Sequence, residues 1–308
     1  MPVIPTFISR YFTTEEPKPP PISTRTAVLL LVLYTFAYVA PFYLSPRTRP
    51  SLTLSRDAPS VIRARTASVS LSCALCSFTT FVILTFGYGG QAPAATVPEA
   101  LHALGYWPVG LREAACCLLL TTLLFVGPLF ETLVVDGGWR DLLALRLVSR
   151  VCSEWTTWRN IVVGPLTEEI LFRSASVPLL LLSGASAWRT IALAPLVFGL
   201  AHLHHYYEAR VSRPSEPRAT AVLRSAFQLT YTTLFGAYAA FLFLRSGSLL
   251  TAVLAHAFCN CMGLPRVWGR VKRWDDGGGA KPRDDLWWTV TYYGLLFLIC
   301  EDDRSEVN

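Results

Sequence analysis

Long apolar blocks alternate with short polar connections along most of this chain. A membrane-spanning helix needs roughly 20 largely apolar residues. About eight blocks approach or reach that length; they cover residues 26–45, 66–87, 114–135, 160–183, 190–205, 224–244, 247–264 and 286–300. The pattern therefore predicts an all-α, polytopic integral membrane protein with about eight transmembrane helices.

Composition supports this class. Charged residues make up 16% of the chain and hydrophobic residues 52%, whereas soluble domains carry about 25% charged residues. The first 25 residues are polar and proline-rich and lack the apolar run of a cleavable signal peptide. We predict a polar N-terminal segment over 1–25, a single transmembrane domain over 26–300, and an acidic tail over 301–308.

The arginines predict an orientation. Segment 46–65 contains five arginines and one aspartate, while segment 88–110 contains no lysine or arginine. Segments 136–160, 206–220 and 265–285 are basic again. By the positive-inside rule, the basic segments face the cytosol, and the N-terminus and acidic tail face the lumen.

The block over 160–183 is unusual because it carries Glu168, Glu169 and Arg173. Each charge inside a membrane costs about 2.5–3.5 kcal/mol on insertion scales, so such residues are functional candidates. Glu169 and Arg173 have the i, i+4 spacing of a helical ion pair. Glu168 points about 100° round the helix and has no partner nearby in sequence, so it is a candidate general base. The alternative is that all three are structural contacts between helices.

Two later blocks contain polar residues of their own. His202 ends the fifth block, and His256 and Asn260 lie one helical turn apart in the seventh. At about 1.5 Å per residue, Glu168, His202 and His256 fall at similar depths in their helices. The sequence thus predicts a polar cavity in the cytosolic half, with a catalytic core over about 160–265.

Three motifs in this order also carry a family resemblance. They are EExxxR (Glu168, Glu169, Arg173), FxxxH (Phe198, His202) and HxxxN (His256, Asn260). The chain resembles the type II CAAX prenyl proteases, the Ras-converting enzymes, and specifically their eukaryotic branch. The flanking sequences that support this are FGLAHLHH (198–205), YTTLFGAYAAFLFLRSG (231–247) and HAFCNCMG (256–263).

The resemblance implies an intramembrane endopeptidase that removes the C-terminal -aaX tripeptide from prenylated CAAX proteins such as Ras-like small GTPases. It also implies a place in the endoplasmic reticulum membrane, with the active site facing the cytosol. Glu168 and His202 would activate the attacking water, and His256 and Asn260 would stabilise the oxyanion. Glu169 and Arg173 would form a supporting ion pair.

Several alternatives stay open. A non-catalytic transporter or scaffold would use the same polar cluster for ion passage, and a related membrane protease would cleave unprenylated peptides. No cofactor is expected, although a glutamate and two histidines also suit zinc.

Other residues have open roles. A group on the sixth block either packs helices or contacts substrate: Tyr231, Thr232, Phe235 and Gly236. His204 and His205 are expected at the membrane edge. The eight cysteines predict no disulfide framework. The sequence leaves open the prenyl group, the favoured CAAX residues and the oligomeric state.

Overall fold

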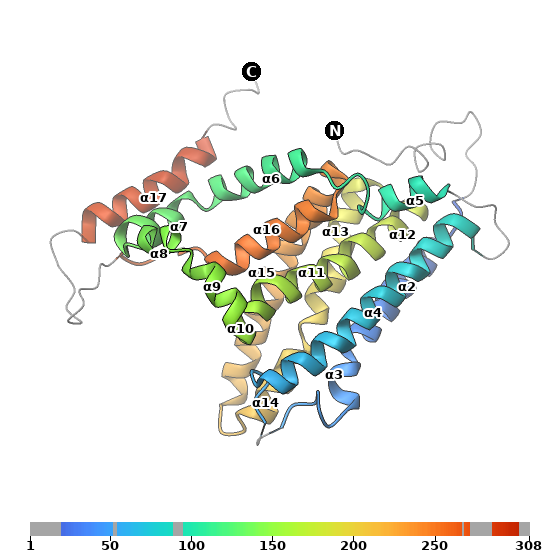
Figure 1. The fold of residues 1–308 in the computed structure, drawn as a ribbon, viewed down its shortest axis with the longest axis horizontal. Helices are drawn as coiled ribbons and strands as arrows, with labels where there is room; N and C mark the ends of the chain where they lie inside the picture. The colour runs from blue at the N-terminus through green and yellow to red at the C-terminus, as the bar shows by residue number, and fades with distance from the viewer. Residues whose placement is uncertain (1–19, 52–53, 89–94, 267, 272–284, 302–308) are drawn as a thin grey trace.

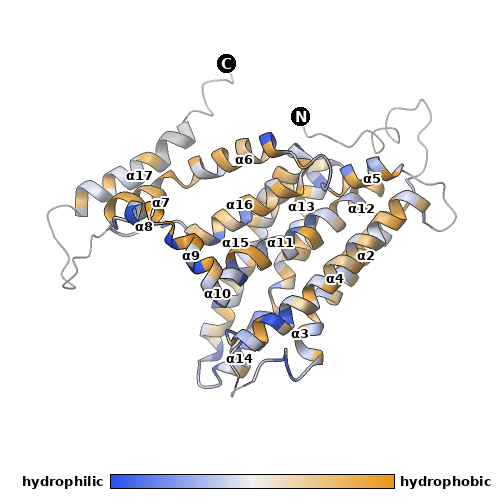
Figure 2. Cartoon of the chain, viewed as in Figure 1, coloured by the Kyte–Doolittle hydropathy of each residue, from blue (hydrophilic) through white to orange (hydrophobic). Residues whose placement is uncertain are grey.

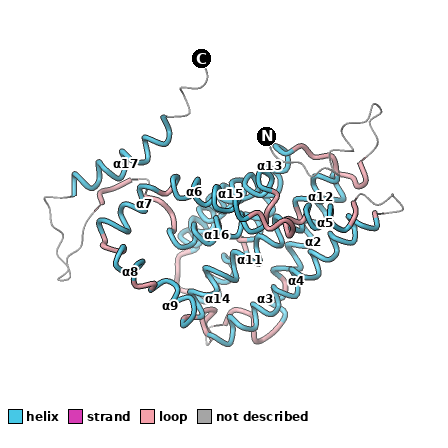
Figure 3. The backbone as a smooth tube through the Cα atoms, turned by 45° about the horizontal axis from the view of Figure 1, so that its top comes forward, coloured by secondary structure: helices cyan, strands magenta, loops and turns pink. Residues whose placement is uncertain are grey.

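The computed structural model describes residues 20–51, 54–88, 95–266, 268–271 and 285–301, and these residues form helices and no strands (Figures 1 and 3). In chain order the helices are α2 (Thr24–Val39), α3 (Pro41–Leu44), α4 (Pro59–Phe86), α5 (Val97–Ala103), α6 (Leu111–Leu124), α7 (Val126–Phe130), η1 (Glu131–Val135), α8 (Trp139–Leu143), α9 (Arg146–Ser153), α10 (Trp155–Trp158), η2 (Arg159–Val163), α11 (Gly164–Glu169), η3 (Ile170–Ala175), α12 (Val177–Leu182), α13 (Ala187–Ala201), α14 (His204–Ser212), α15 (Arg218–Ser246), α16 (Leu249–Met262) and α17 (Asp285–Glu301). The all-α prediction is confirmed. Most of the predicted segments 1–25 and 301–308 lies outside the described residues.

The outer helices expose apolar side chains at helical spacing. Leu29, Leu33 and Phe36 are exposed along α2, as are Leu71 and Leu75 along α4. Figure 2 shows apolar residues along most of the helices, with strongly hydrophilic positions near α9 and α10. Soluble monomers rarely expose such continuous apolar stripes. The chain is therefore a multi-pass membrane protein whose stripes face lipid.

Three helical stretches are long and apolar enough to cross a membrane: Thr24–Leu44, α4 and α15. A fourth is counted if α6 and the following Val126–Val135, bent by 76°, form one span. The other predicted spans correspond to shorter or interrupted helices, such as the 14-residue α16. The count of about eight therefore stays a prediction.

The bend corrects the expectation of one regular helix over 114–135. Phe125, with φ −104° and ψ 17°, ends α6 and precedes Gly127 and Pro128. Proline lacks the backbone N–H that a helix needs and disfavours helical geometry in the residue before it. The sequence signal was present, but the apolar pattern alone did not reveal it.

The continuous helical stretch from η2 to α12 occupies the centre of the fold. η3 contacts α2, α4, α13, α15 and α16, and α11 packs against α4 and α16. Helices α13 and α15 pack closely because both carry glycine at their contact. A Cβ on Gly236 would lie 3.0 Å from Phe198 Cδ1 and 3.1 Å from Pro195 Cβ. This approach fixes α13, at whose end His202 lies.

Contacts join three of the basic connecting segments. Arg159 Nη1 lies 2.7 Å from Asp57 Oδ1, and Arg65 Nη1 lies 2.6 Å from Glu208 Oε1. In Figure 1, α3 and α14 lie at the same end of the molecule. Residues of 46–65, 136–160 and 206–220 thus meet, as expected if these segments lie on one side of a membrane.

Candidate active site

The helix that carries Glu168 is flanked by two π-helical segments, η2 and η3. Each is followed by a helical segment with proline at its second position, Pro165 in α11 and Pro178 in α12. Because proline has no backbone N–H, it removes one regular helical hydrogen bond, and the wider π turn accommodates the gap. Such turns are rare in proteins overall, but those that occur are often found at functional sites. Here Glu168 and Glu169 lie in α11, between the two π-helical segments.

Glu169 points into the protein and is fully buried at 0% exposure, as is Arg173 at 1%. Arg173 Nε lies 3.1 Å from Glu169 Oε2, and Arg173 Nη1 donates to Glu169 Oε1 at 3.1 Å. The guanidinium also donates to the Gly236 carbonyl at 3.2 Å and lies over the Phe198 ring. The i, i+4 ion pair predicted from the sequence is present.

His256 joins this pair from α16. Its Nδ1 lies 2.7 Å from Glu169 Oε1, so Nδ1–H donates to the carboxylate. Its Nε2 lies 4.0 Å from Glu168 Oε2. The His256 imidazole is therefore held between the two glutamates, and Glu168, whose side chain is 22% exposed, has a neighbour that sequence spacing did not supply.

His202 caps the end of α13. Its Nδ1 lies 2.9 Å from the Phe198 carbonyl oxygen. A carbonyl only accepts, so Nδ1 carries the proton and Nε2 of the neutral ring is the acceptor. This tautomer suits a histidine that orients or deprotonates a water molecule.

The four predicted catalytic residues Glu168, His202, His256 and Asn260 all line one cavity of about 620 Å³. A second cavity of about 180 Å³ lies beside it. The residues that line both are Asn160, Glu168, His202, His205 and Asn260. Glu168 and His202 thus stand where the two cavities adjoin.

Asn260 is anchored by a contact that the sequence did not predict. Its Nδ2 donates to the backbone carbonyl of Asn160 in η2 at 2.8 Å. An amide group has two N–H donors; one fixes the side chain, and the second makes no hydrogen bond to any other described residue.

Of the four α15 residues singled out in the sequence, three line a cavity and one packs against a neighbouring helix, and substrate contact stays a prediction. Tyr231, Thr232 and Phe235 line the larger cavity. Gly236 instead contacts α13, and its carbonyl accepts a hydrogen bond from Arg173.

Tyr38 was not identified from the sequence; its hydroxyl lies 3.0 Å from Thr167 Oγ1, and both residues line the smaller cavity.

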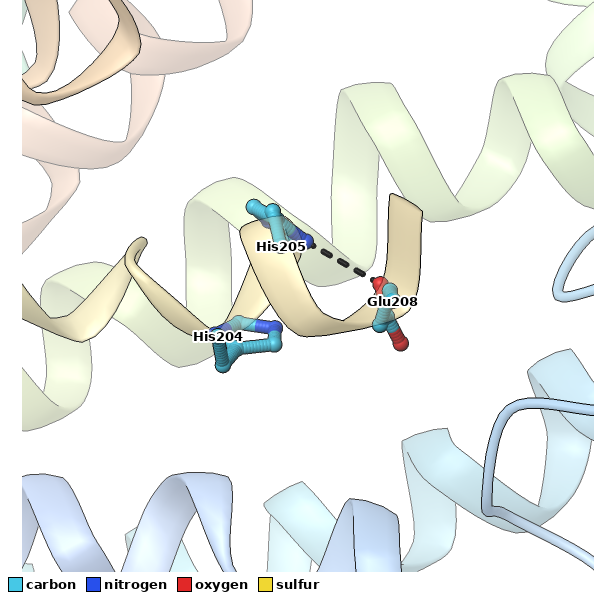
Figure 4. A group of neighbouring side chains, drawn as sticks. All are labelled: His204, His205 and Glu208. Carbon is cyan, nitrogen blue, oxygen red and sulfur yellow. Dashed lines mark hydrogen bonds and ion pairs between the residues drawn. The ribbon is translucent and has the colours of Figure 1, made fainter. Parts of the chain in front are cut away.

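His204, His205 and Glu208 form a group whose ligand atoms lie within 4.8 Å of one another, a spacing that suits a metal ion (Figure 4). His205 Nδ1 lies 3.1 Å from Glu208 Oε2. Glu208 is already paired with Arg65 at 2.6 Å and Arg56 at 3.1 Å. Two guanidinium groups on the carboxylate oppose a further cation, so the residues fit an ion-pair network better than a metal centre.

Fold and site together define a class: a polytopic helical membrane protein with a glutamate–histidine cluster inside the helical bundle. A family model described as type II CAAX prenyl endopeptidase Rce1-like matches residues 150–262. The chain is 35% identical over 280 residues to the probable CAAX prenyl protease 2 of Schizosaccharomyces pombe, covering 91% of this chain and 94% of that protein.

Other relatives agree. CAAX prenyl protease 2 of Homo sapiens is 38% identical over 220 residues, covering 70% of this chain and 65% of the human protein. That of Arabidopsis thaliana is 37% identical over 198 residues, covering 56% of this chain and 62% of the plant protein. No solved structure matches at a significant level. The chain belongs to the type II CAAX prenyl endopeptidase family.

Proposed function

We propose that this protein is an endopeptidase that removes the -aaX tripeptide from prenylated CAAX proteins. The observation that carries the proposal is the convergence of Glu168, His202, His256 and Asn260, from three separate helices, on one cavity. Membership of the family supports the reaction, and the relatives are named CAAX prenyl proteases.

Glu168 and His202 activate the attacking water in this proposal. The carboxylate and the unprotonated Nε2 of His202 are both acceptors, so together they orient a water molecule and take its proton. The water oxygen attacks the carbonyl carbon of the prenylated cysteine. The proton then passes to the nitrogen of the leaving tripeptide as the peptide bond breaks.

His256 and Asn260 stabilise the oxyanion. The cluster of Glu168, Glu169, Arg173 and His256 is electrically neutral when the imidazole is protonated, and then both ring nitrogens are donors. Nδ1–H stays on Glu169, and Nε2–H faces the developing negative charge with the second N–H of Asn260. Preorganised donors of this kind typically lower the barrier by about 3–4 kcal/mol each.

Glu169 and Arg173 support the site by holding His256. A buried histidine keeps one orientation when its other nitrogen is bonded to a fixed carboxylate. Arg173 holds both oxygens of that carboxylate, through Nη1 and Nε. The roles of all six residues suit their chemistry.

The larger cavity suits the lipid part of the substrate. Its apolar lining includes Leu124, Phe125, Leu234, Phe235 and Leu264. A prenyl chain partitions into lipid and brings the attached cysteine to the membrane. The substrates in this proposal include Ras-like small GTPases. The protein lies in the endoplasmic reticulum membrane with its active site facing the cytosol. The contacts between the arginine-rich segments beside the site support this orientation.

The test uses the full chain in membranes, with a farnesylated CAAX peptide and its unprenylated twin. Release of the intact tripeptide from the farnesylated peptide alone supports the proposal. Equal cleavage of both peptides would indicate a protease that does not require the lipid. No cleavage of either would favour the non-catalytic transporter or scaffold. A parallel reaction with a chelator tests zinc: loss of activity would contradict the metal-independent mechanism.

A further inference from the structure

The smaller cavity beside Glu168 has a strongly cationic wall. Arg56 in the turn before α4, Arg65 within α4, and Arg159 at the start of η2 all line it. Glu168 lines the same cavity. The cavity therefore has a polarity, with guanidinium groups on one side and the proposed catalytic carboxylate on another.

The three arginines pair with only two carboxylates among the described residues. Arg65 lies 2.6 Å from Glu208, and Arg159 lies 2.7 Å from Asp57. Arg56 is farther from both carboxylates, 3.1 Å from Glu208 and 4.0 Å from Asp57. Because each carboxylate has a closer cation, three guanidinium groups and two carboxylates leave an excess positive charge at Arg56. The neighbouring histidines add no negative charge.

Arg56 is also the accessible member of the group. Its side chain is 43% exposed, compared with 13% for Arg65. Within the described part of the chain, its contacts with Glu208 and His205 use Nη1, and no contact involves Nη2. It lines the smaller cavity and also a neighbouring one of about 630 Å³. A ligand can therefore reach it without disrupting the buried pair between Arg65 and Glu208.

Arg56 lies close enough to the proposed reaction centre for a tripeptide to reach from one to the other. Arg56 Nη1 lies 3.5 Å from His205 Nδ1, and the His205 and His202 ring centroids are 5.8 Å apart. In series these contacts place the guanidinium within roughly 10 Å of the His202 ring, and three extended residues span at most about 10–11 Å.

We propose that Arg56 binds the terminal α-carboxylate of the substrate, and thereby selects the bond three residues from the chain end. The inference rests on the proposed endopeptidase function. A guanidinium binds a carboxylate through two parallel charge-assisted hydrogen bonds. Glu168 repels the same carboxylate, so the two ends of the cavity orient the tripeptide. Glu208 and Asp57 act as positioning residues that hold Arg56 at the cavity wall.

The test compares two farnesylated peptides of the same sequence, one with a free C-terminal carboxylate and one with a C-terminal carboxamide. Full-length wild type is expected to cleave the acid with a kcat/KM about tenfold or more above that of the amide. Arg56→Ala lowers the rate on the acid to the level of the amide and leaves the amide rate within about twofold of wild type. Arg56→Lys keeps the charge and restores part of the preference.

Arg63→Ala is the matched control, because Arg63 lies on α4, is exposed, and stacks on Trp155 rather than lining the cavities. It removes the same charge and should retain the wild-type preference for the acid. Equal cleavage of acid and amide by wild type would overturn the inference while leaving the endopeptidase function intact. An equal loss on both peptides in Arg56→Ala would overturn it too, by indicating a structural role. Failure of wild type to cleave either peptide would refute the proposed function itself.

Discussion

Removing one member of the buried pair between Glu169 and Arg173 should cost far more stability than removing both. In Arg173→Met, Glu169 stays fully buried, and among the described residues its remaining hydrogen-bond donor is the Nδ1–H of His256. In Glu169→Gln, Arg173 keeps the Gly236 carbonyl and the faces of Phe198 and Phe235, but no carboxylate. Breaking a buried pair from one side costs about 3–5 kcal/mol, because the partner is left charged and uncompensated.

The double variant Glu169→Gln/Arg173→Met removes both charges and keeps similar volumes. Replacing a whole buried pair is often close to neutral, and the introduced amide oxygen still accepts from His256. The double variant should therefore unfold much closer to wild type than the two single costs summed, with a coupling free energy of at least about 2 kcal/mol.

The assay is unfolding in mixed micelles with increasing SDS, read by tryptophan fluorescence, together with tripeptide release from a farnesylated peptide. The double variant should regain stability but not activity, because His256 loses its anionic partner. Additive costs for the two substitutions would show that the two buried charges do not stabilise each other, as would a loss below about 1 kcal/mol for Arg173→Met.

Two further variants test other contacts. Gly199→Ala places a Cβ against Thr233 Oγ1 and 3.0 Å from Leu229 Cδ1. It should therefore separate α13 from α15, displace His202 and lower kcat at least about tenfold. Gly294→Ala is the control, because its added Cβ meets nothing within 4 Å; wild-type activity in Gly199→Ala would contradict the packing argument. Burial raises the pKa of Glu208, but the His205 hydrogen bond and the charges of Arg65 and Arg56 outweigh it and lower the pKa to about 2. Since the folded pKa is below the unfolded value of about 4.3, the charge stabilises the fold above about pH 4.3 and this contribution is lost as pH falls toward 2. Glu208→Gln should thus lower the thermal midpoint at neutral pH, with a difference from wild type that shrinks in acid; a difference that grows in acid would contradict the ion-pair network.

Local patterns in the sequence were sufficient for some of these features. The i, i+4 spacing of Glu169 and Arg173 predicted an ion pair that is present at 3.1 Å. The apolar blocks predicted an all-helical membrane protein. Both signals depend on residues within a few helical turns of each other, so no tertiary information was needed.

Other features depend on contacts between distant parts of the chain. The hydrogen bond from His256 to Glu169 joins residues 87 positions apart, and that from Asn260 to Asn160 joins residues 100 positions apart. Spacing within one helix cannot predict which glutamate a histidine on another helix will contact. The pairing of Arg56 with Glu208 was missed for the same reason, because tertiary packing alone brings α14 beside the turn before α4.

The roles of Glu168, His202, His256 and Asn260 are predictions that turnover measurements test. Glu168 activates the water that hydrolyses the peptide bond in the proposed mechanism. We would measure the single-turnover rate of tripeptide release from a farnesylated CAAX peptide by wild type and Glu168→Gln. Glu154→Gln is the control, because Glu154 is half-buried and lies away from the cavities. We expect the rate to fall about 10²–10⁴-fold in Glu168→Gln at unchanged peptide affinity, and not to fall in the control. Cleavage by Glu168→Gln at the wild-type rate would show that Glu168 does not activate the attacking water.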